Sequence, residues 1–332
     1  MSRILLVLII ALPMFSQGQG CISGDCQEGI GKYTNDKGET YEGHWVNGKP
    51  EGKGTYTNLK GDKYIGEWKA GSIDGRGTYY YGNGSVYTGQ FKNYEKHGSG
   101  KYHYTNGDVY IGDFLNGKRT GEGEYISSNG WQYKGHWKEG LKSGWGSYLY
   151  ANGDKYVGHF RNEKKSGSGT YTWKNGSVYK GGFANNTFHG KAKRTYVNGD
   201  VYDGHFENGV KSGYGVYRYA NGNKYVGTFK NNTKSGKGTY RWADGGSYIG
   251  EFAYNTFHGE AVRAYPGGDK YVGTFQKGKR NGSGVYHTTK GEVYSGQWKN
   301  NLKEGVGVCT KANGVRIQCV WSNDQLMGYK RL

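Results

Sequence analysis

A motif that recurs every 23 residues constrains this chain more than any other feature. The pattern Tyr-x-Gly-x-Trp/Phe begins at Tyr41 and returns at that spacing, without one insertion, until Tyr294. A fixed period of this length is typical of repeat proteins, in which each unit packs mainly on its neighbours. We therefore expect one continuous array rather than two globular domains.

Each repeat is expected to form two antiparallel strands. The marked residues Tyr41, Gly43 and Trp45 alternate, and a period of two places them on one face of a strand. Asn-Gly pairs such as 106–107 predict a tight hairpin turn, whereas the other connection, 116–120, is predicted to be longer. No helix longer than two turns is expected after residue 20.

Glycine and tyrosine are expected to replace the usual aliphatic core. The chain has 63 Gly and 33 Tyr, and only 34% of its residues are hydrophobic. A flat ring can lie over a neighbouring glycine, so stacked repeats would build an aromatic ladder on one face. The predicted ladder residues are Tyr41, Trp45, Tyr64, Trp68, Tyr87, Tyr110, Tyr133, Trp137, Tyr156, Tyr179, Tyr202, Tyr225, Tyr248, Tyr271, Tyr294 and Trp298.

The 23-residue pattern resembles the MORN repeat. Segments 64–68 and 75–79 match it closely, as does 156–160, and the resemblance covers about nine-tenths of the chain. It implies an all-β fold, an elongated single-layer antiparallel sheet of stacked hairpins that forms a twisted and curved rod. It also implies a non-catalytic part that contacts phospholipid membranes or scaffolds and oligomerises proteins. Two repeats depart from the pattern, with Ala192 and Arg194 in one and Ala261 and Arg263 in the other.

The chain ends are expected to differ from the array. A basic residue followed by an apolar run predicts that 1–20 is a signal peptide, with 21–332 a single array of about twelve full repeats and partial caps. The four cysteines, Cys21, Cys26, Cys309 and Cys319, lie only in those caps, and we expect disulfides 21–26 and 309–319. Cys309 and Cys319 should face each other directly. Acylation of Cys21 is a weaker alternative.

The chain is strongly basic, with a formal net charge of +18. Lys and Arg gather after each Trp/Phe, which predicts one basic edge of the sheet that binds an anionic partner through loop tips. The equally weighted alternative is that Lys-rich edges discourage aggregation. Candidate residues of this edge are Lys118, Arg119, Lys142, Lys164, Lys165, Lys234, Lys277, Lys279 and Arg280.

Two loops interrupt the basic edge, and both end in Asn-Thr-Phe-His. Phe188, His189, Phe257 and His258 are candidate docking residues, although duplication of a three-repeat block explains the pairing equally well. Sequons at Asn83, Asn175, Asn185, Asn231 and Asn281 are equally well explained by turn chemistry.

The sequence predicts a binding protein without catalytic, metal or cofactor site. We expect an exported scaffold of the periplasm, cell envelope or exterior that contacts proteins or an anionic membrane surface. The alternative is a binder of glycan or another extended ligand along an aromatic concave face. Nucleic acid is disfavoured by the export signal, and homo-oligomers could form through sheet ends or edges.

Overall fold

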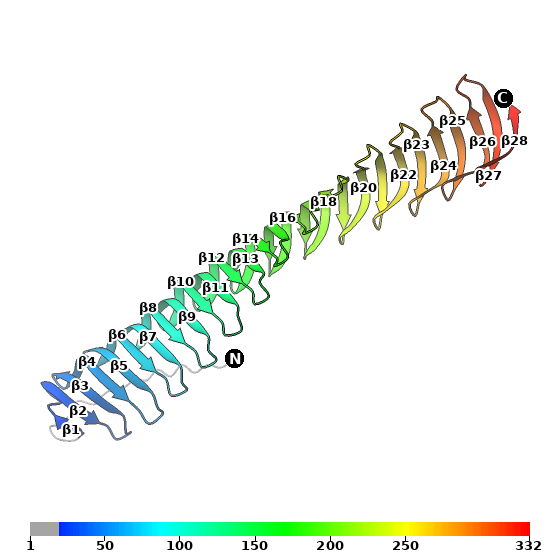
Figure 1. Ribbon diagram of the computed structural model, residues 1–332. Coiled ribbons are helices and arrows are strands. Elements are labelled where there is room, and N and C mark those ends of the chain that lie inside the picture. Colours follow the sequence, from blue (N-terminus) through cyan, green and yellow to red (C-terminus); the bar gives the residue numbers. More distant parts are fainter. Residues whose placement is uncertain (1–19) are drawn as a thin grey trace. The chain divides into compact units, whose positions relative to one another are not determined.

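The computed structural model describes residues 20–332, which form 28 strands and no helix. The chain divides into two compact units, 1–164 and 165–332, and in each the strands pair antiparallel with their neighbours along the chain (Figure 1). The predicted all-β sheet of stacked hairpins is confirmed. The signal peptide predicted at 1–20 lies almost wholly outside the described residues. Within 20–332, no helix is long and apolar enough to cross a membrane.

The strands of the first unit are β1 (Cys21–Gly24), β2 (Gly29–Thr34), β3 (Thr40–Val46), β4 (Lys49–Thr57), β5 (Lys63–Lys69), β6 (Ser72–Tyr80), β7 (Val86–Lys92), β8 (Glu95–His103), β9 (Val109–Leu115), β10 (Lys118–Ile126), β11 (Gln132–Lys138), β12 (Leu141–Leu149) and β13 (Lys155–Arg161). Strand β14 (Lys164–Thr172) begins at the boundary. The second unit continues with β15 (Val178–Ala184), β16 (Thr187–Thr195), β17 (Val201–Glu207), β18 (Val210–Arg218), β19 (Lys224–Lys230), β20 (Thr233–Arg241), β21 (Ser247–Ala253), β22 (Thr256–Ala264), β23 (Lys270–Gln276), β24 (Lys279–His287), β25 (Val293–Lys299), β26 (Leu302–Thr310), β27 (Arg316–Ser322) and β28 (Gln325–Arg331).

The two connections of a repeat are the reverse of the prediction. The tight turn lies at Asn116 and Gly117, which have φ of 50° and 75° and join β9 directly to β10. Positive φ at both positions suits the twist of a two-residue hairpin. The Asn106-Gly107 pair instead belongs to a longer loop, closed by a hydrogen bond from the Tyr104 N–H to the Asp108 carbonyl at 2.9 Å. Both connections contain the same dipeptide, so the dipeptide alone could not distinguish them.

A bulge accounts for the first glycine of each Gly-x-Gly. Between β7 and β8, Gly89 pairs with Gly100 and Gln90 with His97, which leaves Gly98 and its neighbour unpaired in the ladder of hydrogen bonds. Gly98 has φ of 57°, a conformation that glycine adopts without steric cost.

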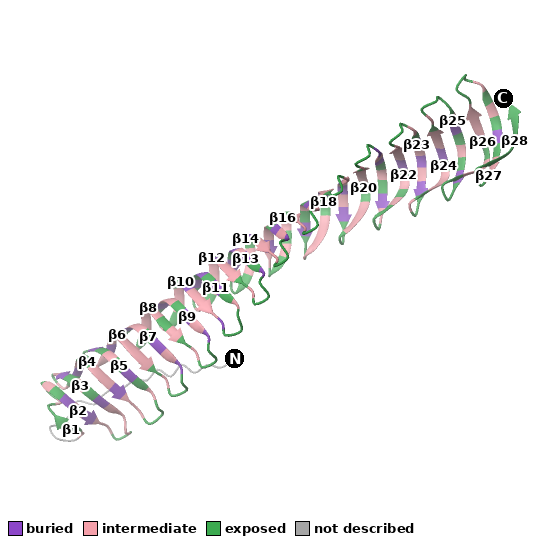
Figure 2. Ribbon diagram, in the orientation of Figure 1, coloured by how far each residue is buried: buried purple, intermediate pink, exposed green. Residues whose placement is uncertain are grey.

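The aromatic ladder forms the core of each sheet. Tyr87 packs edge-to-face on Phe91 of its own repeat, with ring centroids 5.0 Å apart, and on Phe114 of the next repeat, at 5.1 Å. A methyl group at Gly89 or Gly100 would lie within 2.5 Å of the Tyr87 hydroxyl oxygen. The ring thus lies across a pair of bare glycines, as predicted, and the buried positions recur from strand to strand (Figure 2).

Hydrogen bonds at both edges connect successive repeats. At the longer loops, the Asp200 carboxylate accepts the N–H of Ala220 at 2.8 Å. At the tight turns, the Asn232 side-chain oxygen accepts the N–H of Lys211 at 2.8 Å. The contacts recur in several other repeats, so the edges as well as the core hold neighbouring hairpins in register.

The structure joins the two predicted cysteine pairs, Cys21–Cys26 and Cys309–Cys319. The prediction that the C-terminal pair is directly opposed is wrong, because β26 and β27 pair Cys309 with Ile317. The bond therefore runs diagonally across the hairpin, with Cα atoms 6.0 Å apart. Thr310 pairs with Arg316, so the hairpin is centred on Asn313, one residue before the Gly314 about which the two cysteines are symmetric.

Candidate binding surfaces

The predicted ladder residues are all buried, each at most 5% exposed. A ligand could not stack on them while the sheet stays folded, so the predicted binding of glycan along an aromatic concave face is not available at these rings. Exposed aromatics are scattered instead. Trp145 is 50% and Tyr214 62% exposed, and the Trp145 ring packs on His159.

The predicted basic edge splits into two sets of different character. Lys118, Lys164, Lys277 and Lys279 are exposed at the tight turns. Arg119, Lys142, Lys165, Lys234 and Arg280 are only partly exposed and lie over aromatic rings. The expectation that all of them are loop tips with little packing is therefore wrong for the second set. These residues begin the second strand of each hairpin, where every other side chain faces the ladder.

One cation lies over the rings of an ordinary repeat. The Lys211 ammonium is 4.8 Å from the Tyr217 ring centroid, and the Tyr219 ring lies beside Tyr217 at 4.5 Å. Such contacts contribute about 0.5–2 kcal/mol each. Burial lowers the pKa of Lys211, as it does for Lys96 and Lys234. The second aromatic column, to which Tyr219 belongs, was not predicted, although the recurrence of tyrosine at loop starts such as 81, 104 and 265 could have indicated it.

Two repeats, 179–201 and 248–270, exchange the positions of ring and cation, and we call them the exchanged repeats. Phe257 stands where eight of the twelve repeats have Lys or Arg, and where the first two have Pro50 and Ile73; its ring stacks on Tyr248 at 4.0 Å and 18°. Arg263 stands where they have Tyr, with its guanidinium 3.6 Å from the Trp242 ring centroid. Phe188 and Arg194 repeat the arrangement.

Because ring and cation are exchanged, two of the four predicted docking residues are not available for docking. Phe188 and Phe257 lie within the aromatic face, stacked on ladder tyrosines, rather than projecting as docking bumps. Only His189 and His258 are exposed. Ala261 fills part of the space over its paired glycine, where an ordinary repeat has the tyrosine ring.

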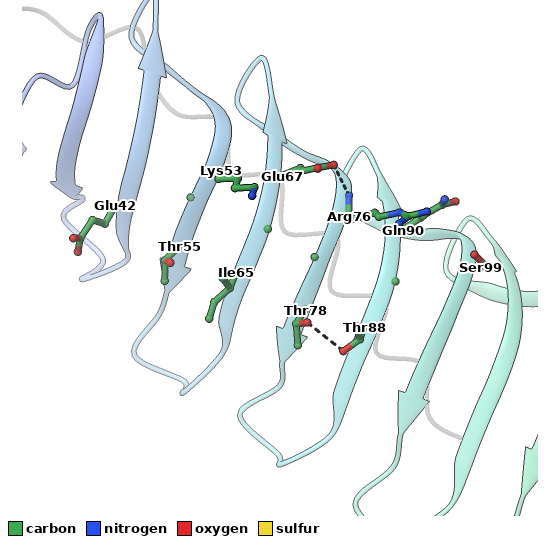
Figure 3. Close-up of a pocket in the computed structure, with 14 residues that line it drawn as sticks. Glu42, Lys53, Thr55, Ile65, Glu67, Arg76, Thr78, Thr88, Gln90 and Ser99 are labelled. Atoms are coloured by element: carbon green, nitrogen blue, oxygen red, sulfur yellow. Dashed lines mark hydrogen bonds between the residues drawn. The ribbon is translucent and has the colours of Figure 1, made fainter.

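A polar hollow of about 880 Å³ lies on the opposite face of the first unit, across β3 to β8 (Figure 3). Its side chains form two rows, and the view shows Thr78 hydrogen-bonded to Thr88 and Glu67 to the N–H of Arg76. The lining side chains are Glu42, Lys53, Thr55, Ile65, Glu67, Arg76, Thr78, Thr88, Gln90 and Ser99. Charges of both signs and hydroxyl groups therefore offer hydrogen bonds there, alongside the carbon surface of Ile65, the glycines and the aliphatic stems.

Exposed cations remain at the tight-turn edge of each unit, which we call the basic turn edge. In the first unit they are Lys49, Lys69, Lys92, Lys118, Lys138, Arg161 and Lys164, and in the second Lys230, Lys277, Lys279 and Lys299. Lys118 is paired with Glu139, an exposed contact that contributes little. Most of this row is free to meet an anionic partner.

No group of three His, Cys, Asp or Glu side chains in residues 20–332 is arranged to hold a metal ion. His136 and His159 occupy equivalent positions in neighbouring hairpins, and His136 lies 2.8 Å from the Glu122 carboxylate. This is a solvent-exposed pair on the sheet surface.

Comparison with solved structures gives only remote likenesses. The TCP domain of SAS-4 from Drosophila melanogaster, solved with a proline-rich motif of Ana2, has 14% identity and a TM-score of 0.29, over 54% of this chain and 85% of that one. The TCP10 domain of CPAP from Danio rerio, solved with a STIL peptide, has 10% identity and a TM-score of 0.30, over 80% and 98%. Virginiamycin B lyase from Staphylococcus aureus has 10% identity and a TM-score of 0.13, over 90% and 86%. These values carry no functional argument.

No curated protein matches the chain. The MORN repeat, in contrast, matches twelve consecutive segments from 41–63 to 294–316, each beginning at a ladder tyrosine. These segments cover most of the chain and coincide with the hairpin, bulge and turn just described. The repeat is of a non-catalytic type that generally serves in binding and scaffolding. The chain therefore belongs to the MORN-repeat family.

Proposed function

We propose that this chain is an exported, non-catalytic binding protein that attaches to anionic membrane surfaces through its basic turn edge. The observation that carries the proposal is the row of exposed Lys and Arg side chains at the tight turns of each unit. A basic residue near an anionic membrane contributes about 1 kcal/mol of attraction. The apolar N-terminal segment supports export, and the two disulfides fit an oxidising compartment.

Vesicle flotation tests this proposal. The protein is expected to float with vesicles that contain acidic phospholipid and to remain below vesicles of neutral phosphatidylcholine. Binding should weaken steeply as salt screens the charges. Flotation with both kinds of vesicle, or with neither, would contradict the proposal.

A charge-reversal pair localises the attachment. Lys118→Glu, Lys138→Glu and Lys164→Glu together should lower the membrane partition coefficient by about tenfold or more. The matched control carries the same three charge reversals at exposed residues of the opposite, longer-loop edge: Lys60→Glu, Lys63→Glu and Lys155→Glu. Equal losses in both variants would show that net charge, and not the basic turn edge, governs binding.

The polar hollow supports a second candidate function, binding of an extended hydrophilic ligand such as a glycan. Its two rows of hydroxyl, amide and charged groups run across six strands (Figure 3). A glycan array at two salt concentrations tests this candidate, because hydrogen-bonded sugar binding should persist at high salt while membrane attachment is lost. Thr78→Arg would obstruct the hollow and should abolish array signals that depend on it.

A further inference from the structure

The aromatic face of the second unit ends in a pocket of about 720 Å³ between β24 and β28. Ordinary repeats fill the corresponding space with two rings, such as Tyr217 and Tyr219, whose centroids are 4.5 Å apart. Towards the C-terminus, Thr288 and then Lys311 replace the loop aromatic, and Cys309 replaces the tyrosine. The pocket is therefore the space that aromatic side chains occupy elsewhere in this chain.

Three groups that serve a tyrosine in the preceding repeat recur around this pocket. Tyr286 donates its hydroxyl to the Asp269 carboxylate at 2.8 Å, and lies 5.4 Å from the Arg280 guanidinium and 6.0 Å from Trp298. One repeat later, the matching residues are Glu292, Lys303 and Trp321, and all three line the pocket. The tyrosine between them is absent.

Those groups lack the partner that their counterparts have. The Glu292 carboxylate has no hydrogen-bond or ion-pair partner among the described residues, whereas Asp269 accepts from both Tyr286 and the Thr289 N–H. The Lys303 ammonium lies 4.2 Å from the Trp321 ring centroid, but the tyrosine ring that lies 5.4 Å from its counterpart Arg280 has no equivalent here. The Trp321 indole nitrogen is buried without an acceptor.

We propose that this pocket binds a tyrosine side chain of a partner polypeptide. The phenol ring takes the place of the missing tyrosine beside Lys303 and Trp321, and its hydroxyl donates to Glu292. A polypeptide is favoured because a tyrosine side chain fills the corresponding space in the ordinary repeats, and because Val293, Ile317 and Leu326 line the pocket with apolar surface for the residues that flank the tyrosine. This site is separate from the basic turn edge and does not depend on it.

Fluorescence anisotropy with dye-labelled pentapeptides tests the proposal on the full chain. The probe acetyl-Thr-Val-Tyr-Val-Thr-amide should bind about tenfold more tightly than the same peptide with phenylalanine, because a hydrogen bond to a charged carboxylate is lost. Equal affinity for the two peptides, or no saturable binding, would overturn the assignment. If N-acetyl-tyrosinamide competes as strongly as unlabelled pentapeptide, the ligand is a small phenol and the polypeptide partner is wrong.

Two variants locate the site. Glu292→Ala should remove the preference for tyrosine over phenylalanine, whereas Glu260→Ala, an exposed acid of the same unit outside the pocket, should preserve it. Thr288→Tyr restores the loop aromatic and should abolish binding of both peptides, while Thr288→Ser leaves it. If the tyrosine preference survives Glu292→Ala, or Thr288→Tyr still binds the peptide, the pocket is not the site.

Discussion

Ordinary and exchanged repeats both pack a cation against aromatic rings, but the cation and one of the rings occupy each other's positions in the two kinds of repeat. The repeat that begins at Tyr225 places Lys234 over Tyr240, with 4.9 Å between the ammonium and the ring centroid. The exchanged repeat that follows has Phe257 and Arg263 at those two positions, and its guanidinium lies over Trp242. Both arrangements keep one cation over the rings, although the repeats that begin at Tyr41 and Tyr64 have Pro50 and Ile73 at the cation position and do without it.

The largest expected effect concerns what both kinds of repeat share, the buried tyrosines. Burial raises the pKa of Tyr179 in an exchanged repeat and of Tyr271 in an ordinary one to about 12. A raised folded-state pKa stabilises the fold below the unfolded value of about 10, and this stability is lost as pH rises through the folded value. Buried lysines act oppositely, since the lowered pKa of Lys211 means that raising the pH relieves its desolvation.

The tyrosines whose pKa burial raises outnumber the lysines whose pKa it lowers, Lys96, Lys211 and Lys234, so the protein should unfold cooperatively above about pH 10. Ionising many buried tyrosines should cost more than a typical unfolding free energy of about 5–15 kcal/mol, because each phenolate would be buried without its hydration. Circular dichroism and tyrosinate absorbance, followed together during alkaline titration, check this. Complete tyrosine ionisation with the β-sheet signal intact would contradict it.

The next effect separates the two kinds of repeat at the second glycine. A methyl group at Gly238 would lie 2.6 Å from the Tyr225 ring, whereas the exchanged repeat already carries Ala261 there. Gly238→Ala should therefore lower the unfolding free energy by about 3 kcal/mol. Ala261→Gly should cost about 1 kcal/mol or less, the usual cost of glycine in a strand. Denaturant melts of both variants measure the difference, and equal costs would mean that the tyrosine ring does not set the glycine requirement.

A smaller effect distinguishes packed from exposed cations within an ordinary repeat. Arg119 lies 4.2 Å from the Trp137 ring centroid, whereas the adjacent Lys118 is exposed. Arg119→Glu should lower the unfolding free energy by about 2 kcal/mol, because the ring contact is lost and a carboxylate meets the aromatic face. Lys118→Glu should change it by less than about 0.5 kcal/mol. Thermal melts of the pair test this, and matching melting temperatures would show that Arg119 does not stabilise the sheet.

The smallest effect is the coupling between ring and cation in an exchanged repeat. In an Ala261→Gly background, Phe257→Lys places two cations together and Arg263→Tyr leaves none, whereas the two changes combined recreate the ordinary arrangement. A double-mutant cycle should give a favourable coupling of about 1 kcal/mol. Additive single effects would indicate that the two substitutions arose independently and are not compensating.

The period of the sequence was enough to predict the fold, because Tyr-x-Gly-x-Trp/Phe specifies a strand, a face and a neighbour at once. It could not assign the tight turn, since Asn116-Gly117 and Asn106-Gly107 are alike and only the hydrogen bonds of the finished sheet distinguish them. For the basic edge, the position of the cations at the turns was predicted, but not which of them pack on aromatic rings. Whether Arg119 faces rings or solvent depends on the bulge that follows it, and a bulge leaves no mark beyond one more glycine.

The C-terminal pocket could not be predicted from the sequence for a different reason. The pocket exists because Thr288, Cys309 and Lys311 stand where other repeats have aromatic residues. These replacements are recognised as a cavity only when the repeats are compared in three dimensions. The disulfide pairing of Cys309 and Cys319 was predictable from their place in the last hairpin, but its diagonal register was not.

The ladder also determines how such a gene can change length. Tyr202 packs on Phe229, and Tyr225, one repeat on, packs on Phe252 in the same way. Deleting residues 225–247 would bring Phe252 to the place where Phe229 stood, so the ladder contact with Tyr202 would be kept. Gain or loss of a whole repeat thus changes the packing of the remaining repeats very little, whereas insertion of one residue moves the buried side chains of a strand to its opposite face. Unequal recombination in steps of 23 codons is the mutation that this architecture tolerates best.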